Sequence, residues 1–154
     1  MTGKIPDGFQ TVTAILVYKD CPKALAFYEK AFGARTRKCM KLPDGKVVHA
    51  ELVIGTSVVF LTDELPFAPS KAPRAGSLTN EMYLYVADCD AFLAKAASAG
   101  ATVTMPCRDM FYGDRIGALA DPFGYVWTVA THLEDVPPAE AEKRLQAWAK
   151  SLPS

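Results

Sequence analysis

The chain has 154 residues, half of them hydrophobic, which suits one domain with a sizeable core. Its 17 Lys and Arg residues balance 17 Asp and Glu residues, so charge gives no reason to expect a nucleic acid or a membrane as partner. The first residues lack the apolar core of a signal peptide, and no apolar run is long enough to span a membrane. We therefore expect a cytoplasmic protein.

Residues 11–64 predict a β-α-β-β-β module. The run TVTAILVY at 11–18 is rich in β-branched residues and is typical of a strand. Asp20 is placed to cap a helix that Gly33 ends. Three further strands are expected at 35–41, 47–54 and 57–62, the last two joined by a turn at Gly55-Thr56.

Residues 65–79 are rich in Pro, Ser, Lys and Gly and predict a linker or mobile loop. Residues 80–132 repeat the order of the first module, with a helix that Asp88 caps. An apolar stripe then predicts a helix at 137–152 that docks on its own domain or on a dimer mate. The four strands of this second module are expected at 81–86, 102–105, 116–120 and 125–131.

The two modules are related by a constant offset in the sequence. Cys21 and Cys89 lie 68 residues apart, and so do Cys39 and Cys107. The same offset places Asp20 on Asp88 and other matching residues on one another, which indicates an internal duplication. The four cysteines form no CxxC motif, so we interpret them as structural residues.

Several segments carry a resemblance to a known family. They are DGKVVHAELVIG (44–55), MFYGDRIG (110–117), DPFGYVW (121–127) and ATHLEDV (130–136). With the paired modules, they resemble the vicinal oxygen chelate superfamily of glyoxalase I, bleomycin-resistance proteins, extradiol dioxygenases and fosfomycin-resistance enzymes, and more narrowly its PhnB-like branch. The resemblance implies an α+β fold in which two tandem βαβββ modules form a curved, half-open mixed sheet around a cleft, with a C-terminal helix. It also implies a homodimer.

The resemblance places the metal ligands of such proteins at four positions of this chain: Thr13, Phe60, Glu81 and Thr128. Divalent ions of this class prefer imidazole and carboxylate ligands, and of the four only Glu81 provides one. We therefore expect that the metal site is lost and that the protein has no cofactor. A divalent metal held by His49 and Glu51, on one face of a strand, is the alternative.

The turn at Gly55-Thr56 predicts which side chains of the first module face the cleft. As a two-residue turn, it places Glu51 opposite Phe60. Side chains alternate across a strand, so His49 shares this face. A slip of one residue would reverse the assignment.

The turn of the second module is expected to be centred on Pro122-Phe123. It then places Gly117 opposite Thr128 and Arg115 opposite Ala130, so that Arg115 points into the cleft. Glu81, Tyr83 and Tyr85 are expected to point inward as well. By the same alternation Trp127 belongs to the core, and His132 is expected at the surface or an interface.

Two functions are compatible with this site. In the first, a small planar or anionic molecule binds without a metal, and the ligand-binding candidates are Thr13, Phe60, Tyr83, Tyr85, Arg115 and Thr128. In the second, a glyoxalase-type isomerase or lyase uses the catalytic candidates His49, Glu51 and Glu81 for proton transfer. Arg115 and Glu81 could equally form a structural ion pair. The sequence leaves open whether the protein is an enzyme.

Overall fold

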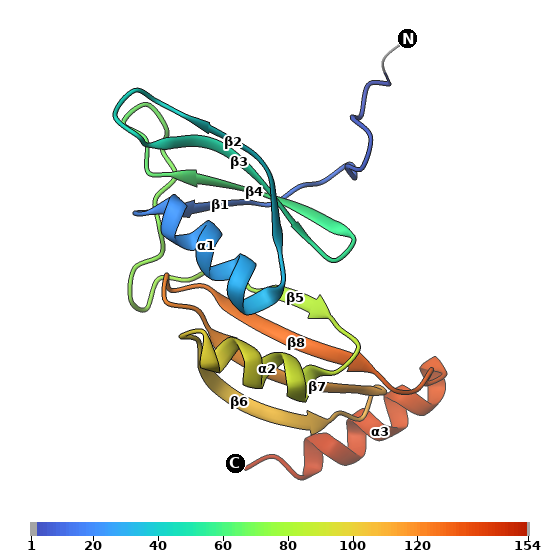
Figure 1. The fold of residues 1–154 in the computed structure, drawn as a ribbon. Coiled ribbons are helices and arrows are strands. Elements are labelled where there is room, and N and C mark those ends of the chain that lie inside the picture. The colour runs from blue at the N-terminus through green and yellow to red at the C-terminus, as the bar shows by residue number, and fades with distance from the viewer. Residues whose placement is uncertain (1–2, 154) are drawn as a thin grey trace. The chain divides into compact units, whose positions relative to one another are not determined.

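The computed structural model describes residues 3–153, so the ends of the expected 1–154 domain lie outside the described residues. The chain divides into two compact units, one up to Leu78 and one from Thr79 onward. Each contains one β-α-β-β-β module whose strands form a four-stranded mixed sheet, and the second unit adds a C-terminal helix (Figure 1). The predicted α+β fold of two tandem modules is confirmed.

In the first unit the sheet has the order β1-β4-β3-β2, with β1 parallel to β4 and the other pairs antiparallel. Helix α1 covers one face of this sheet (Figure 1). Ala24 and Tyr28 of the helix and Leu52 and Leu61 of the strands are all buried. No helix among the described residues of this unit lies over the opposite face, which we call the helix-free face. The elements are β1 (Ile15–Tyr18), α1 (Cys21–Phe32), β2 (Arg35–Lys41), β3 (Val47–Ile54) and β4 (Ser57–Asp63).

The second unit repeats this arrangement with the order β5-β8-β7-β6 and with α2 over one face. Helix α3 lies close to the predicted range, and its Trp148 packs against Phe111 with ring centroids 5.3 Å apart. The elements are β5 (Met82–Tyr85), α2 (Cys89–Ser98), β6 (Thr102–Asp109), β7 (Asp114–Ala120), β8 (Val126–His132) and α3 (Pro138–Lys150).

Two strands, β1 and β6, show the largest differences in length from their predictions. The first strand is shorter than 11–18, because pairing with β4 starts only at Ala14, whose carbonyl accepts the Phe60 N–H at 2.9 Å. Strand β6 extends past the predicted 102–105 and contains Pro106. It is an edge strand, where a residue without an N–H donor is tolerated.

The duplication recurs in the hydrogen bonds that fix each helix to its sheet. The Cys21 N–H donates to Asp63 Oδ1 at 2.7 Å, and the Cys89 N–H donates to Thr131 Oγ1 at 2.8 Å. Donors and acceptors are both related by the offset of 68 residues. The start of each helix is therefore bound to the end of the last strand of its module.

The register of the first hairpin is as predicted, and that of the second is not. Glu51 pairs with Phe60, but Gly117 pairs with Val129 instead of Thr128. The second turn contains an extra residue, because Gly124 adopts a φ of 94° and Asp121 closes the loop with Tyr125. A type I turn followed by a left-handed glycine forms such three-residue loops.

This one-residue difference reverses the face of each β7 side chain. Arg115 pairs with Thr131 and not with Ala130, so its side chain lies on the face covered by α2. The predicted inward position of Arg115 is wrong. Trp127 is 1% exposed, which confirms its place in the core.

The segment predicted as a linker is packed in part against the first unit. Leu65 and Ala72 are buried, and the Ala72 N–H donates to Glu64 Oε1 at 2.9 Å. Within residues 3–153, no helix combines the length and apolar character needed to cross a membrane.

The turn of the second hairpin gives a stability prediction. Asp121 is buried and accepts hydrogen bonds from the Phe123 N–H, the Tyr125 N–H and Trp127 Nε1 at 2.9, 3.0 and 2.8 Å. Each buried donor left without a partner costs about 1–3 kcal/mol. We expect Asp121→Ala to lower the free energy of unfolding by about 3 kcal/mol or more, measured by urea denaturation.

The control is Asp44→Ala, in the exposed turn between β2 and β3, where the carboxylate accepts the Lys46 N–H at 3.1 Å. This exposed substitution should cost no more than about 1 kcal/mol. Equal losses in the two variants would contradict the role assigned to Asp121.

Candidate functional site

Phe60 lies at the centre of the helix-free face of the first unit. Its ring contacts His49 and Phe9 edge-to-face, with centroid distances of 4.6 and 5.6 Å. Strand β4 supplies Phe60, strand β3 supplies His49, and Phe9 comes from the segment before β1. The structure therefore joins two of the predicted residues to an aromatic ring that the sequence had not indicated.

Glu51, opposite Phe60, is a buried carboxylate with two side-chain partners. Arg37 Nε donates to its Oε2 at 2.7 Å, and His49 Nε2 lies 3.4 Å from its Oε1. Burial alone would raise the pKa of Glu51, but the hydrogen bonds from Arg37 and His49 outweigh burial and lower this pKa below its ordinary value. Glu51 is therefore an anion at neutral pH, held by two potential cations.

Arg37 contacts Glu51 on this face at a point where β2 is irregular. The pairing of β2 with β3 shifts between Thr36 and Lys38, which leaves Arg37 as an extra residue in the strand. Its guanidinium carbon lies 4.5 Å from the centroid of the Phe9 ring. The sequence analysis assigned no face to the side chains of this strand, so it did not indicate Arg37.

Phe60 lines two hollows. The larger has a volume of about 510 Å³ and the smaller about 230 Å³. Lys4, Phe9, Thr13, Arg37, Lys38 and Glu51 are among the residues that line the larger one. The smaller is mainly apolar, with Ile15, Val17, Leu65 and Ala68 beside His49 and Thr62.

In the second unit, Tyr83 and Tyr85 converge on a carboxylate that the sequence analysis missed. Their hydroxyls donate to Asp114 Oδ2 at 3.2 and 2.8 Å. Asp114 Oδ1 lies 2.7 Å from His132 Nδ1, and His132 Nε2 lies 2.8 Å from Asp135 Oδ1. Asp114 is 4% exposed, while both tyrosines and His132 are exposed.

These contacts shift the pKa values of Asp114, His132, Tyr83 and Tyr85. Burial would raise the pKa of Asp114, but its hydrogen bonds to His132 and the two tyrosines lower it. The hydrogen bond to Asp114 is the main cause of the raised pKa of His132 and of Tyr85. Burial, followed by hydrogen bonds to Tyr112 and Asp114, raises the pKa of Tyr83. The carboxylate and the imidazolium therefore stabilise one another.

The remaining predicted residues lie as follows. Glu81 and Thr128 contact one another, with Thr128 Oγ1 donating to Glu81 Oε2 at 3.4 Å. Arg115 is instead bound to Asp90 and Asp109, with Nε 2.7 Å from Asp90 Oδ2 and Nη1 2.9 Å from Asp109 Oδ1. Arg115 therefore does not lie with Tyr83 and Tyr85. Its ion-pair partners are Asp90 and Asp109, not Glu81.

The four positions that the family uses for a metal do not suit a divalent ion here. Thr13 lines the larger hollow with Phe60, and neither offers an anionic donor. Glu81 offers one carboxylate, and Thr128 a neutral hydroxyl that donates to it. Zn²⁺ and related ions require several imidazole, thiolate or carboxylate ligands. This donor set does not fit such an ion.

Comparison with known proteins places the fold in a family. The profile of the Glyoxalase/Bleomycin resistance protein/Dioxygenase superfamily matches residues 9–129. The chain belongs to this superfamily. Its members share a fold that supports small-molecule binding or catalysis.

One sequence relative and two solved structures illustrate what this chain is similar to. The uncharacterized protein Mb0911c of Mycobacterium bovis is 38% identical over 125 residues, which cover 79% of this chain and 82% of the relative. The crystal structure of TioX from Micromonospora sp. ML1 has a TM-score of 0.65 at 26% identity, covering 80% of this chain and 99% of TioX. A PhnB protein from Bacillus cereus has a TM-score of 0.60 at 16% identity, covering 79% of this chain and 99% of that one. The last match shows the fold and not the branch.

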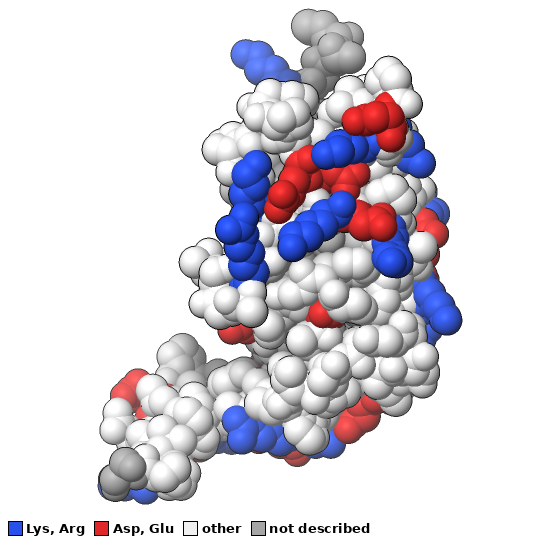
Figure 2. All heavy atoms as spheres, turned by 90° about the vertical axis from the view of Figure 1, so that its left-hand side faces the viewer, with Lys and Arg blue, Asp and Glu red and all other residues white. Residues whose placement is uncertain are grey.

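The charge on one face of the molecule favours a small ligand over a polyanion. Figure 2 shows Lys and Arg side chains interspersed with Asp and Glu side chains on the face that it presents. The binding of nucleic acids depends on clustered positive charge.

The contact between Asp114 and His132 predicts a pH dependence. The raised pKa of His132 means that this stabilisation is complete below the ordinary histidine value of 6.5 and is lost as pH rises through the pKa of the folded state. The lowered pKa of Asp114 means that it is also lost in acid, as pH falls through the pKa of the folded carboxyl. We expect the NMR signals of His132 to titrate with a midpoint above 6.5.

The variant Asp114→Asn should lower this midpoint, because the neutral amide no longer favours the imidazolium. His49→Gln removes the signals of the other histidine and so assigns those of His132. A midpoint that Asp114→Asn leaves unchanged would show that the carboxylate does not hold the imidazolium.

Proposed function

We propose that the protein binds a small planar anion on the helix-free face of the first unit. The observation that carries the proposal is the 510 Å³ hollow, which two aromatic rings and three cationic side chains line. Its volume lies within the roughly 300–1,000 Å³ range of small-molecule sites. The rings are Phe9 and Phe60, and the cations are Lys4, Arg37 and Lys38.

The charges of the hollow favour an anion. Glu51 is the acidic residue in its lining, and Arg37 and His49 already bind that carboxylate. The two lysines therefore leave positive charge for a ligand. Lysine and arginine side chains form strong hydrogen bonds with carboxylates and phosphates.

The aromatic rings favour a planar ligand. Phe60 packs edge-to-face with both Phe9 and His49, and the planar guanidinium of Arg37 lies over the Phe9 ring, so the hollow already holds flat groups against one another. Stacked or edge-to-face rings contribute about 0.5–1.5 kcal/mol beyond the burial of their area. A flat anion such as an aromatic carboxylate satisfies both features of the hollow.

Binding of the proposed ligand requires no metal ion at the four positions that the family resemblance assigns to metal ligands. Glu81 provides the one anionic donor of that set, so Lewis-acid activation of a substrate there has too few ligands to support it. Binding and sequestration therefore fit the residues better than metal-assisted isomerisation.

Isothermal titration calorimetry tests the proposal with matched probes. We expect benzoate and larger aromatic carboxylates to bind, and their neutral amides to bind at least about tenfold more weakly, which corresponds to the loss of about 1.4 kcal/mol. The double variant K4Q/K38Q should lose this preference for the anion. It removes two cations of the hollow and leaves the Arg37–Glu51 pair in place.

Phe60→Leu keeps an apolar side chain and removes the ring, so it should weaken binding of every aromatic probe. The control Phe67→Leu changes a phenylalanine that is 72% exposed and does not line either hollow. The proposal fails if wild-type protein binds no carboxylate, or if Phe60→Leu and Phe67→Leu bind the carboxylates equally well.

The pairing of His49 with Glu51 favours a second candidate function, proton transfer on a small carbonyl compound. An imidazole held by a carboxylate can act as a general base near neutral pH. If this function holds, the protein should speed deuterium exchange from D₂O into α-hydroxyketones, measured by NMR. His49→Ala should abolish the exchange without abolishing binding of the aromatic carboxylates.

His132→Ala serves as the matched control, because it removes the histidine of the second unit. Exchange at the uncatalysed rate in wild-type protein would rule out the catalytic function and leave the binding function standing. Equal loss of exchange in the two variants would show that His49 is not the base.

A further inference from the structure

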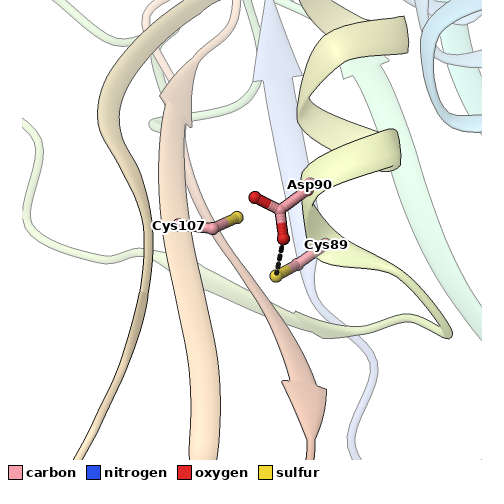
Figure 3. A group of neighbouring side chains, drawn as sticks. All are labelled: Cys89, Asp90 and Cys107. Atoms are coloured by element: carbon pink, nitrogen blue, oxygen red, sulfur yellow. Dashed lines mark hydrogen bonds between the residues drawn. The ribbon is translucent and has the colours of Figure 1, made fainter.

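Two cysteines and an aspartate come together on the helix-covered side of the second unit. One ligand atom from each of Cys89, Asp90 and Cys107 lies within 4.8 Å of the other two. Figure 3 shows the side chain of Cys107 pointing from β6 toward Cys89 and Asp90 at the start of α2. Among residues 3–153 this is the one group of three or more His, Cys, Asp or Glu residues with that spacing.

The local structure fixes all three ligands. Cys89 and Asp90 begin α2, and the hydrogen bond from the Cys89 N–H to Thr131 binds this end of the helix to β8. Cys107 lies over Gly117, where an added Cβ would be 2.9 Å from the Cys107 sulfur. The glycine therefore makes room for the thiol beneath α2.

The two modules share the pair of cysteines but not the rest of this cluster. Cys21 and Cys39 are the equivalents of Cys89 and Cys107, but Pro22 stands in place of Asp90. Arg115, which binds Asp90, is equivalent to Val47. The second module alone therefore combines the two thiols with a carboxylate and an arginine that holds it.

We propose that Cys89, Asp90 and Cys107 form a binding site for a thiophilic divalent cation such as Zn²⁺. Thiolates select zinc and similar soft ions, and zinc accepts a mixture of sulfur and carboxylate ligands in tetrahedral geometry. Three protein ligands leave the fourth position for water. The side chain of Asp90 is 55% exposed, so solvent reaches that position.

Arg115 is an outer partner of this site rather than a competitor for it. Its Nε lies 2.7 Å from Asp90 Oδ2 and its Nη2 lies 3.1 Å from Oδ1. A carboxylate oxygen has two lone pairs, so Asp90 can accept from Arg115 and still bind an ion. Outer partners of this kind orient metal ligands. The charge of Arg115 also offsets the net negative charge of two thiolates, one carboxylate and Zn²⁺.

Proton release couples the site to pH. A thiol must lose its proton to bind the metal. Affinity for Zn²⁺ should therefore rise with pH, and binding should release protons into the solution.

The site is distinct from the one the family uses. It includes neither Glu81 nor Thr128 and lies on the α2 side of its sheet. It is also independent of the proposed anion site, which belongs to the first unit. Failure of one proposal therefore leaves the other intact.

The test uses the full chain, reduced and freed of metal by a chelator that is then removed. Zn²⁺ is titrated against a competing chromophoric chelator, and Cd²⁺ is titrated while the ultraviolet charge-transfer band of its thiolate complex is recorded. We expect one equivalent of each ion, with the band present. Cys107→Ser should weaken Zn²⁺ by more than the roughly 10- to 100-fold that loss of an outer partner costs.

Two controls locate the site. Cys39→Ser changes the equivalent cysteine of the first module and should bind Zn²⁺ as tightly as wild type. Glu81→Gln removes the carboxylate of the family position and should do the same. Asp90→Asn leaves both thiols in place and should weaken Zn²⁺ while the Cd²⁺ band persists.

Circular dichroism spectra of all variants establish that they are folded. Cys107 is replaced rather than Cys89 because it is partly exposed, so its replacement disturbs packing less than replacement of the buried Cys89. Equal Zn²⁺ affinity in Cys107→Ser and wild type would overturn the proposal. Loss of Zn²⁺ in Glu81→Gln, or a Cd²⁺ complex without the thiolate band, would overturn it as well.

Discussion

In both units the first N–H of the packed helix donates to a side chain at the end of the last strand, from Cys21 to Asp63 and from Cys89 to Thr131. This contact fixes the start of each helix to the end of the last strand of its sheet. The opposite face of the first sheet is left for Phe60, His49 and the two hollows. Beneath the second helix, the same contact places Cys89 where Cys107 can meet it.

Most of this arrangement could be predicted from the sequence, because duplication and alternation are properties of the order of residues. The offset of 68 residues predicted two modules of the same topology, and the turn at Gly55-Thr56 predicted that Glu51 would face Phe60. Both follow from local rules, namely two-residue turns and the period of a strand. Membership of the superfamily followed from the same segments.

The errors have a common cause, which is that one extra residue in a strand or turn reverses every face assignment beyond it. Gly124 adds a residue to the second turn, so Arg115 moved to the helix side and Asp114 came to face Tyr83. The shift of register at Arg37 in the same way places Lys38 opposite Glu51, where alternation alone would pair it with Ala50. A hydrophobic pattern does not show an extra residue in a turn or strand, and for this reason the sequence indicated neither Asp114 nor Lys38.

The buried acids show why the two open faces differ from the rest of the protein. Asp63 is held by the backbone N–H groups of Cys21 and Val47, and Asp121 by two backbone N–H groups and a tryptophan. Such donors cannot leave without unfolding the chain. Glu51 and Asp114 are held instead by side chains, among them two histidines. Side-chain donors can turn toward a ligand or change protonation while the fold persists, so buried carboxylates of this second kind lie where chemistry is possible.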